Sequence, residues 1–337
     1  MDALSDVLRA VRPTGATFFD VQASEPWVAE TPPGASIVGS IFPGADHLIP
    51  YHALTRGSCC GGLLDEAPLR LSAGDVIVFP HGDPHVLASA PGMRHEPDLS
   101  LYRRPPDGQL PFSLSVGGTS QDTAATGANA RQEAEPQGAR LVCGYLACDA
   151  RPFNPLLAAL PRVIRVSERE GGAIGAFLAF AVEESRQPRI GGECVLGRLS
   201  ELMFVDVVRR YLETLPADRT DWLAGLRDPF VGRALAALHG DPARDWTLES
   251  LCREVGLSRS ALAERFTQFV GQPPMQYLAS WRMQLAAIRL RGGTESVAEV
   301  AELVGYESEA AFSRAFKRAV GTSPGAWRNR TGGRDAA

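Results

Sequence analysis

The sequence predicts an α+β protein with an N-terminal domain of short strands, a helical connector and a C-terminal all-α domain. Three observations support this fold class. Residues 14–102 alternate short apolar runs with Gly, Pro and Asp, which is typical of strands and turns. From about residue 153 onward, apolar residues recur at helical spacing. Within that part, a pattern of helix, glycine turn and helix occurs twice.

Composition excludes a membrane protein and gives a weak hint about the partner. The 337 residues are 45% hydrophobic and 22% charged, and no apolar run approaches the roughly 20 residues that span a membrane. The N-terminal sequence MDALSDVLRAVRP has no signal-peptide core. We therefore expect a cytoplasmic protein without a membrane partner. The net charge is −5, but residues 228–337 hold 14 basic and 12 acidic residues, which is compatible with a polyanionic partner.

The N-terminal domain is expected to span residues 1–160. It begins with a short amphipathic helix that ends before Pro13, and its strands run to about residue 102. Residues 103–139 are rich in Pro, Gly, Ser, Thr and Ala, which predicts a loop or a partly disordered insertion. The segment LVCGYLA at 141–147 reads as a further strand.

A helical connector is expected over residues 161–228. Its main element is the segment LGRLSELMFVDVVRRYLETL at 196–215, where the apolar residues form a broad helical face. Such a face can pack against the N-terminal domain or pair with a second copy of the chain.

The duplicated pattern lies in residues 229–331. In the first copy, the helix TLESLCREV ends at Gly256, and Ser258 can cap the next helix. In the second copy, Ser296 and Glu299 form a capping box and Gly305 takes the turn position. A helix, a glycine-containing turn and a second helix form the helix-turn-helix signature, whose second helix enters the DNA major groove.

The helix MQYLASWRMQLAAIRL joins the two copies. It is expected to hold both recognition helices on one face, about one DNA turn or roughly 34 Å apart. A single copy could equally be a structural helix pair, whereas two joined copies indicate DNA binding.

Residues 229–331 resemble the DNA-binding domain of AraC/XylS-type transcription regulators. The segment VGYESEAAFSRAFKRAVGTSPGAWR closely resembles the second-motif signature of that family. The resemblance implies transcription regulation, with activation expected, and double-stranded promoter DNA and RNA polymerase as partners. It also implies a homodimer formed through the helix at 196–215. We favour dimerisation over packing against the N-terminal domain as the role of this helix, because a dimer doubles the DNA footprint.

Candidate DNA-contacting residues follow from the geometry of the two recognition helices. Arginine can donate two hydrogen bonds to guanine, and glutamate can accept one from cytosine. The expected base-reading residues are Arg259, Ser260, Ala263, Glu264, Glu309, Ala310, Ser313 and Arg314. The expected phosphate contacts are Arg265, Arg282, Lys317 and Arg318. Ala263 and Ala310 are smaller than the residues that the family often has there.

The segment GDVIVFPHGDPH at 74–85 resembles the second motif of cupin barrels, and this resemblance implies that the N-terminal domain is a cupin-like β-barrel. The first cupin motif is eroded in DHLIPYHALTRG at 46–57. His52, His81 and His85 are the candidate metal ligands, and the alternative is that these histidines form hydrogen bonds in a barrel without metal. We expect no cofactor.

Four cysteines are candidate sensor residues, because some regulators with this domain combination respond to reactive chlorine species through cysteine oxidation. They are Cys59, Cys60, Cys143 and Cys148. Cys59 and Cys60 are neighbours on a predicted strand, so their side chains should point to opposite faces. The alternative is that all four are small buried hydrophobic residues.

The sequence thus predicts a transcription regulator whose cupin-like domain senses an unidentified effector, either a small molecule or an oxidant. One alternative is a metal-dependent cupin enzyme with an appended DNA-binding module, but the eroded first motif favours a non-enzyme. The other is a DNA-binding protein with a vestigial barrel.

Overall fold

The computed structural model describes residues 2–11, 13–102, 112–117, 138–167, 172–187 and 189–332. The chain divides into a unit built on strands, residues 13–148 and 161–213, and a helical unit that comprises 1–12, 149–160 and 214–337. The domain boundaries expected at residues 160 and 228 stay predictions. No helix in the described part of the chain is long and apolar enough to cross a membrane.

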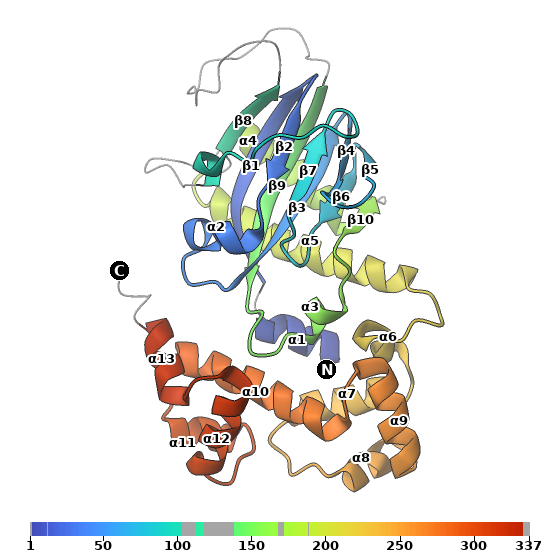
Figure 1. The fold of residues 1–337 in the computed structure, drawn as a ribbon, viewed down its shortest axis with the longest axis vertical. Coiled ribbons are helices and arrows are strands. Elements are labelled where there is room, and N and C mark those ends of the chain that lie inside the picture. The colour runs from blue at the N-terminus through green and yellow to red at the C-terminus, as the bar shows by residue number, and fades with distance from the viewer. Residues whose placement is uncertain are drawn as a thin grey trace. The chain divides into compact units, whose positions relative to one another are not determined.

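Two sheets form the strand unit (Figure 1). The six-stranded sheet has the order β10-β6-β3-β9-β1-β8 and the four-stranded sheet the order β2-β7-β4-β5. Their bounds are β1 Thr14–Ser24, β2 Val28–Thr31, β3 His47–Arg56, β4 Ser58–Leu63, β5 Leu69–Ser72, β6 Asp75–Val78, β7 His85–Ala88, β8 Phe112–Gly117, β9 Gly138–Cys148 and β10 Ile164–Ser167.

The core of the strand unit contains side chains from both sheets. Strand β9 pairs antiparallel with both β1 and β3, and its alternate residues Leu141, Cys143 and Tyr145 belong to this core. On the other face of β3, the ring of Tyr51 meets that of Phe177 edge-on, with centroids 5.9 Å apart. The remaining elements of the unit are α2 Gly34–Ile41, the 3-10 helix η1 Leu99–Tyr102, α4 Ala173–Arg186 and α5 Gly192–Thr214.

The segment expected to be a loop at 103–139 contains a strand, so that expectation is wrong for part of its length. Residues 112–117 form β8, which pairs parallel with β1 at the edge of the larger sheet. Phe112 lies opposite Phe19, and their ring centroids are 5.7 Å apart. Tertiary pairing outweighs the loop-like composition of the flanking residues. Residues 103–111 and 118–137 lie outside the described part.

The helical unit holds both helix-turn-helix motifs, joined by the helix α10. Both motifs pack against α10. Phe266 of the first motif contacts the ring of Tyr277 on α10, and Phe316 of the second motif belongs to one buried cluster with Met283 and Leu290 of α10. The elements are α6 Trp222–Arg227, α7 Val231–Gly240, α8 Leu248–Val255, α9 Arg259–Val270, α10 Pro274–Gly292, α11 Val297–Leu303, α12 Glu309–Val320 and α13 Pro324–Gly332.

Two segments from the N-terminal half also belong to the helical unit. Helix α1, Ala3–Val11, buries an apolar face against α7 and α10, as its spacing predicts. Helix α3, Pro155–Ala159, packs on α6. Just before α3, the backbone N–H of Phe153 donates to Gln284 of α10 at 2.9 Å. The helical unit is therefore assembled from three separate stretches of the chain.

Candidate nucleic-acid interface

The first helix-turn-helix is formed by α8, a glycine turn and α9. Thr247 and Ser250 make a capping box at the start of α8. Gly256 ends α8 in the left-handed region, with φ of 74°, and Ser258 accepts a hydrogen bond from the backbone of Ala261 at the start of α9. These local features match the sequence expectation for the turn and for the cap.

The second motif repeats the plan with α11 and α12. Ser296 accepts from the backbone N–H of Glu299 at 3.2 Å, and Glu299 accepts from that of Ser296 at 2.6 Å, which completes the predicted capping box. Gly305 has φ of 82°, and a Cβ there would lie 2.5 Å from the carbonyl oxygen of Ala243. Both its conformation and its surroundings therefore require glycine.

The two recognition helices bury one side and expose the other. Leu262 and Phe266 of α9, like Phe312 and Phe316 of α12, are fully buried. The expected base-reading residues lie on the other side: Arg259, Ser260, Glu264, Glu309, Ala310 and Arg314 are exposed, and Ala263 and Ser313 are half-buried. The basic residues Lys317 and Arg318 are exposed farther along α12.

The helix α10 joins the two motifs. This helix has 19 residues, which corresponds to a length of about 28 Å at 1.5 Å per residue. That length is close to one turn of B-form DNA, roughly 34 Å.

Arg265 binds within the protein rather than projecting freely. Its guanidinium donates to both carboxylate oxygens of Asp228, with an Nη2–Oδ2 distance of 2.5 Å. The buried Asp228 also accepts the backbone N–H groups of Phe230 and Val231 at the start of α7, and these donors together with Arg265 lower its pKa against the opposing effect of burial. The ion pair ties α9 to the start of α7, a role that residue spacing did not indicate.

Arg282 of α10 is also engaged inside the unit. It donates to the carbonyl oxygens of Pro242, Arg244 and Gly305, at 2.7, 2.9 and 3.1 Å. Burial lowers the pKa of this guanidinium. The Arg282 side chain thus joins the loop before α8 to the turn of the second motif. Sequence reasoning could not find this role, because the acceptors are backbone atoms 23 to 40 residues away.

In the strand unit, two of the three candidate histidine ligands meet. The Nε2 atoms of His52 and His85 are 2.8 Å apart. His85 Nδ1–H donates to the carbonyl oxygen of Asp83, so neutral His85 accepts at Nε2 and His52 Nε2–H donates. Burial lowers the pKa of His85 to about 4 and that of His52 well below its ordinary value, so both rings are neutral.

The third candidate, His81, is exposed, so the structure does not bring it to this pair. A first-row metal wants three or four protein ligands, and the described residues contain no cluster of three candidate ligands. The candidate ligands therefore do not fit a resident metal ion, whereas His52 and His85 form a hydrogen-bonded pair in the strand unit. The Nδ1 atom of His52 has no partner within the described residues.

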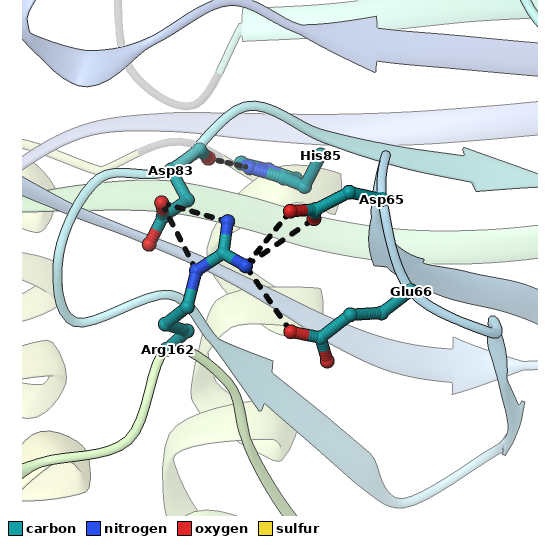
Figure 2. Close-up of polar contacts among 5 residues, drawn as sticks. All are labelled: Asp65, Glu66, Asp83, His85 and Arg162. Carbon is teal, nitrogen blue, oxygen red and sulfur yellow. Dashed lines mark hydrogen bonds and ion pairs between the residues drawn. The ribbon is translucent and has the colours of Figure 1, made fainter.

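Arg162 forms an ion-pair network beside this pair (Figure 2). Its guanidinium donates to Asp65, Glu66 and Asp83, with nitrogen–oxygen distances of 3.0 to 3.3 Å. Asp83 therefore accepts from Arg162 through its carboxylate and from His85 through its backbone. The network joins the turns after β4 and β6 to the segment before β10, and sequence spacing gave no signal for it.

The four candidate sensor cysteines are all buried. Cys59 and Cys143 lie in the core of the strand unit, and burial raises the pKa of Cys59 to about 12 and that of Cys143 further. Neither is a thiolate at neutral pH, which disfavours rapid oxidation. Cys60 lies outside this core and lines a pocket of about 90 Å³ with Val86 and Ala88. Cys194, which the sequence did not single out, is exposed on α5.

The helix expected at 196–215 is α5, Gly192–Thr214. Met203, Phe204 and Val207 are buried within the strand unit. On its outer side, Val195 is 42% exposed and Leu202 51% exposed. The helix therefore packs within the strand unit, which is one of the two roles expected for it. It also leaves the apolar side chains of Val195 and Leu202 exposed to solvent.

Comparison with known proteins agrees with both units. The cupin family model matches residues 2–213, and a helix-turn-helix domain model matches residues 251–330. An AraC-like transcription regulator of Streptomyces lividans is 32% identical over 97% of this chain and 98% of its own. The transcriptional activator RclR of Escherichia coli, described as specific for RCS, is 25% identical over 98% of each chain.

Among solved structures, the DNA-binding domain of AdpA, determined in complex with a target DNA, is 30% identical. That alignment covers 33% of this chain and 99% of the AdpA domain, with a TM-score of 0.31. The match to the Streptomyces regulator spans nearly all of both chains. This regulator and AlkR of Acinetobacter baylyi, another relative of this chain, are named as transcription regulators rather than enzymes. The chain therefore belongs to the AraC-like transcription regulators, with a cupin domain followed by an AraC-type helix-turn-helix DNA-binding domain.

Proposed function

We propose that this regulator binds promoter DNA through α9 and α12, which enter two successive segments of the major groove. The observation that carries the proposal is the pair of capped recognition helices whose polar sides are exposed while their aromatic sides are buried against a shared scaffold. The connecting helix α10 is long enough to separate them by about one DNA turn.

Base reading is assigned to Arg259 and Ser260 near the start of α9 and to Glu309 and Arg314 on α12, with Ala263, Glu264, Ala310 and Ser313 beside them. All lie on the exposed or half-buried side. Phosphate contacts are assigned to Lys317 and Arg318, which are exposed on α12. Arg265 and Arg282 are left out of this set, because their guanidinium groups are held by Asp228 and by backbone carbonyls.

The strand unit is proposed to be the sensor. The Nδ1 of His52, which has no partner among the described residues, gives the core of this unit a hydrogen-bond acceptor and favours a small molecule with a donor group. The high pKa of Cys59 weakens the oxidant alternative at that residue. Effector binding would act by stabilising one of two arrangements of the chain.

A homodimer formed through α5 completes the proposal, because Val195 and Leu202 are exposed one heptad apart on its outer side. We further propose that the bound dimer activates transcription by contact with RNA polymerase. RclR, one of the relatives, is named as an activator.

The test is footprinting of the full chain on the region upstream of its own gene, over a series of salt concentrations. We expect two protected major-groove segments about one turn apart. Arg314→Ala should weaken binding by about 1–3 kcal/mol and relax base preference in one segment. Arg314→Lys is the matched control, since it keeps the charge but loses the two-bond contact to guanine. Protection that is independent of sequence, with only the salt-sensitive affinity of a basic surface, would refute the proposal.

A further inference from the structure

A pocket of about 510 Å³ lies within the helical unit, between α1, the end of α7 and α10. These helices lie together in Figure 1. Its size falls in the range of small-molecule sites. Apolar side chains such as Ala10 and Leu285 line it, together with the rings of His239 and Trp281. None of its lining residues belongs to the strand unit or to the recognition helices.

The two rings form one wall and are almost completely buried. His239 is 6% exposed and Trp281 is 1% exposed, and they stack with ring centroids 4.2 Å apart and planes inclined by 27°. Burial lowers the pKa of His239 to about 3, so its ring is neutral. The wall therefore presents two flat, uncharged rings.

A hydrogen-bond chain determines where the proton of His239 lies. The hydroxyl oxygen of Tyr277 accepts from Trp222 Nε1–H at 2.9 Å and lies 2.8 Å from His239 Nε2. The hydroxyl group of Tyr277 donates its hydrogen to Nε2 of His239, so this nitrogen is the acceptor. The proton of the neutral imidazole therefore lies on Nδ1. His239 therefore offers an Nδ1–H donor.

Neither His239 Nδ1 nor Trp281 Nε1 has a hydrogen-bond partner in the described part of the chain. Buried N–H groups without a partner are rare and costly in folded proteins. Here two of them belong to stacked rings that line one pocket. A ligand oxygen that accepts hydrogen bonds would remove the cost.

The rest of the pocket restricts the kind of ligand. Asp6 accepts from Arg9 at 3.0 Å and Glu295 accepts from Arg289 at 3.1 Å, so each acidic group at the rim has a basic partner. The rim thus carries no net formal charge from these pairs. The lining combines apolar side chains with polar groups, which favours a ligand with a flat or aliphatic body and a polar end.

We propose that this pocket is a second ligand site, which holds a small organic molecule through a carbonyl or carboxylate oxygen that accepts from Trp281 and His239. The site goes beyond the sensing proposed for the barrel, since it lies in the DNA-binding unit itself. Helices α1 and α10 both contribute to it, and α10 joins the two helix-turn-helix motifs. A bound ligand would stabilise this unit by mass action.

The experiment uses the full chain with benzoate and benzamide as probes. Both carry the required oxygen on a flat apolar ring, and they distinguish a charged from a neutral acceptor. Benzylamine is the control probe, because it lacks that oxygen. The readouts are calorimetric binding and the thermal transition seen by tryptophan fluorescence, which reports mainly on the helical unit because Trp222, Trp246, Trp281 and Trp327 belong to it. We expect saturable stabilisation by benzoate or benzamide and none by benzylamine.

Two variants test the location. Trp281→Phe removes the N–H donor, and Leu285→Trp fills the pocket while Trp281 stays in place. Each should weaken probe binding by roughly tenfold or more. Should Trp281→Phe fail to fold, Leu285→Trp decides. Leu303→Glu, which changes an exposed residue of α11 outside the pocket, should leave probe binding unchanged.

Absence of saturable binding by either oxygen-bearing probe would overturn the proposal, and so would binding that persists unchanged in the variants that fold. Benzoate binding abolished by Leu303→Glu would place the site outside this pocket and would also overturn it. None of these readouts uses DNA, so their failure is distinct from a failure of the footprinting test.

Discussion

Glycine is favoured at the two helix-turn-helix turns for two reasons, a positive φ and a lack of space for a Cβ atom. Replacing each turn glycine by alanine separates these two effects. Gly256 and Gly305 both have positive φ, 74° and 82°. An added Cβ at Gly256 meets no atom within 4 Å. At Gly305 it would lie 2.5 Å from the carbonyl oxygen and 2.9 Å from the Cα of Ala243, and 2.8 Å from Arg282 Nη2. Only the second position is also sterically closed.

The expected costs follow from these distances. The left-handed conformation costs a non-glycine residue roughly 1–2 kcal/mol, partly offset by about 0.4–1 kcal/mol from the stiffer unfolded chain. Gly256→Ala should therefore destabilise by about 1 kcal/mol. Gly305→Ala adds an overlap with backbone atoms, which cannot rotate away, and overpacking of this kind costs typically 1–3 kcal/mol. We expect a total of about 2–4 kcal/mol for Gly305→Ala.

Urea unfolding of the full chain, followed by tryptophan fluorescence, measures both changes in the free energy of unfolding. Far-ultraviolet circular dichroism of the folded variants checks that the native helix content is kept. Equal losses for the two variants, within about 0.5 kcal/mol, would refute the steric argument at Gly305.

Three further predictions concern an ion pair, a buried histidine and a helix face. Arg265→Ala should leave the salt dependence of DNA affinity unchanged, whereas Lys317→Ala should lower its slope by about one, as measured by binding titrations over a salt series. His239 has a folded pKa of about 3, below the ordinary value of 6.5, so the unfolded chain takes up its proton first and stability is lost as the pH falls below 6.5. His239→Gln should therefore reduce the slope of unfolding free energy against pH by up to about 1.4 kcal/mol per pH unit between pH 6 and 4, measured by urea unfolding, and an unchanged slope would contradict this reasoning. Leu202→Glu on α5 should shift sedimentation toward the monomer, while Leu303→Glu, which changes an equally open leucine on α11, should not.

Local signals in the sequence determined the helix-turn-helix motifs. The turn at Gly256, the cap at Ser258 and the capping box of Ser296 and Glu299 all depend on residues within a few positions of one another. Helical spacing likewise predicted which side of each recognition helix is buried, because the 3.6-residue period is itself local. Cupin and AraC-type domains were therefore both predictable from motifs.

Tertiary structure alone decided where the long polar side chains bind. The sequence predicted that Arg265 and Arg282 contact phosphate. In the structure they bind Asp228 and the carbonyl oxygen of Pro242, which lie 37 and 40 residues away along the chain. A carboxylate or carbonyl oxygen brought close by folding competes with solvent for such a side chain, and spacing along the chain does not reveal it.

Chain-distant contacts also decided the composition of each unit. Strand β8 lies within a segment whose composition predicts a loop, and it forms because β1 offers an open edge. Helix α1 was predicted as a helix, but only the packed structure shows that its apolar face is buried against α7 and α10. The meeting of His52 on β3 with His85 on β7 likewise depends on the packing of two different sheets, which brings together residues 33 positions apart. The packing partners in all three cases are distant in the sequence, and no local pattern identifies them.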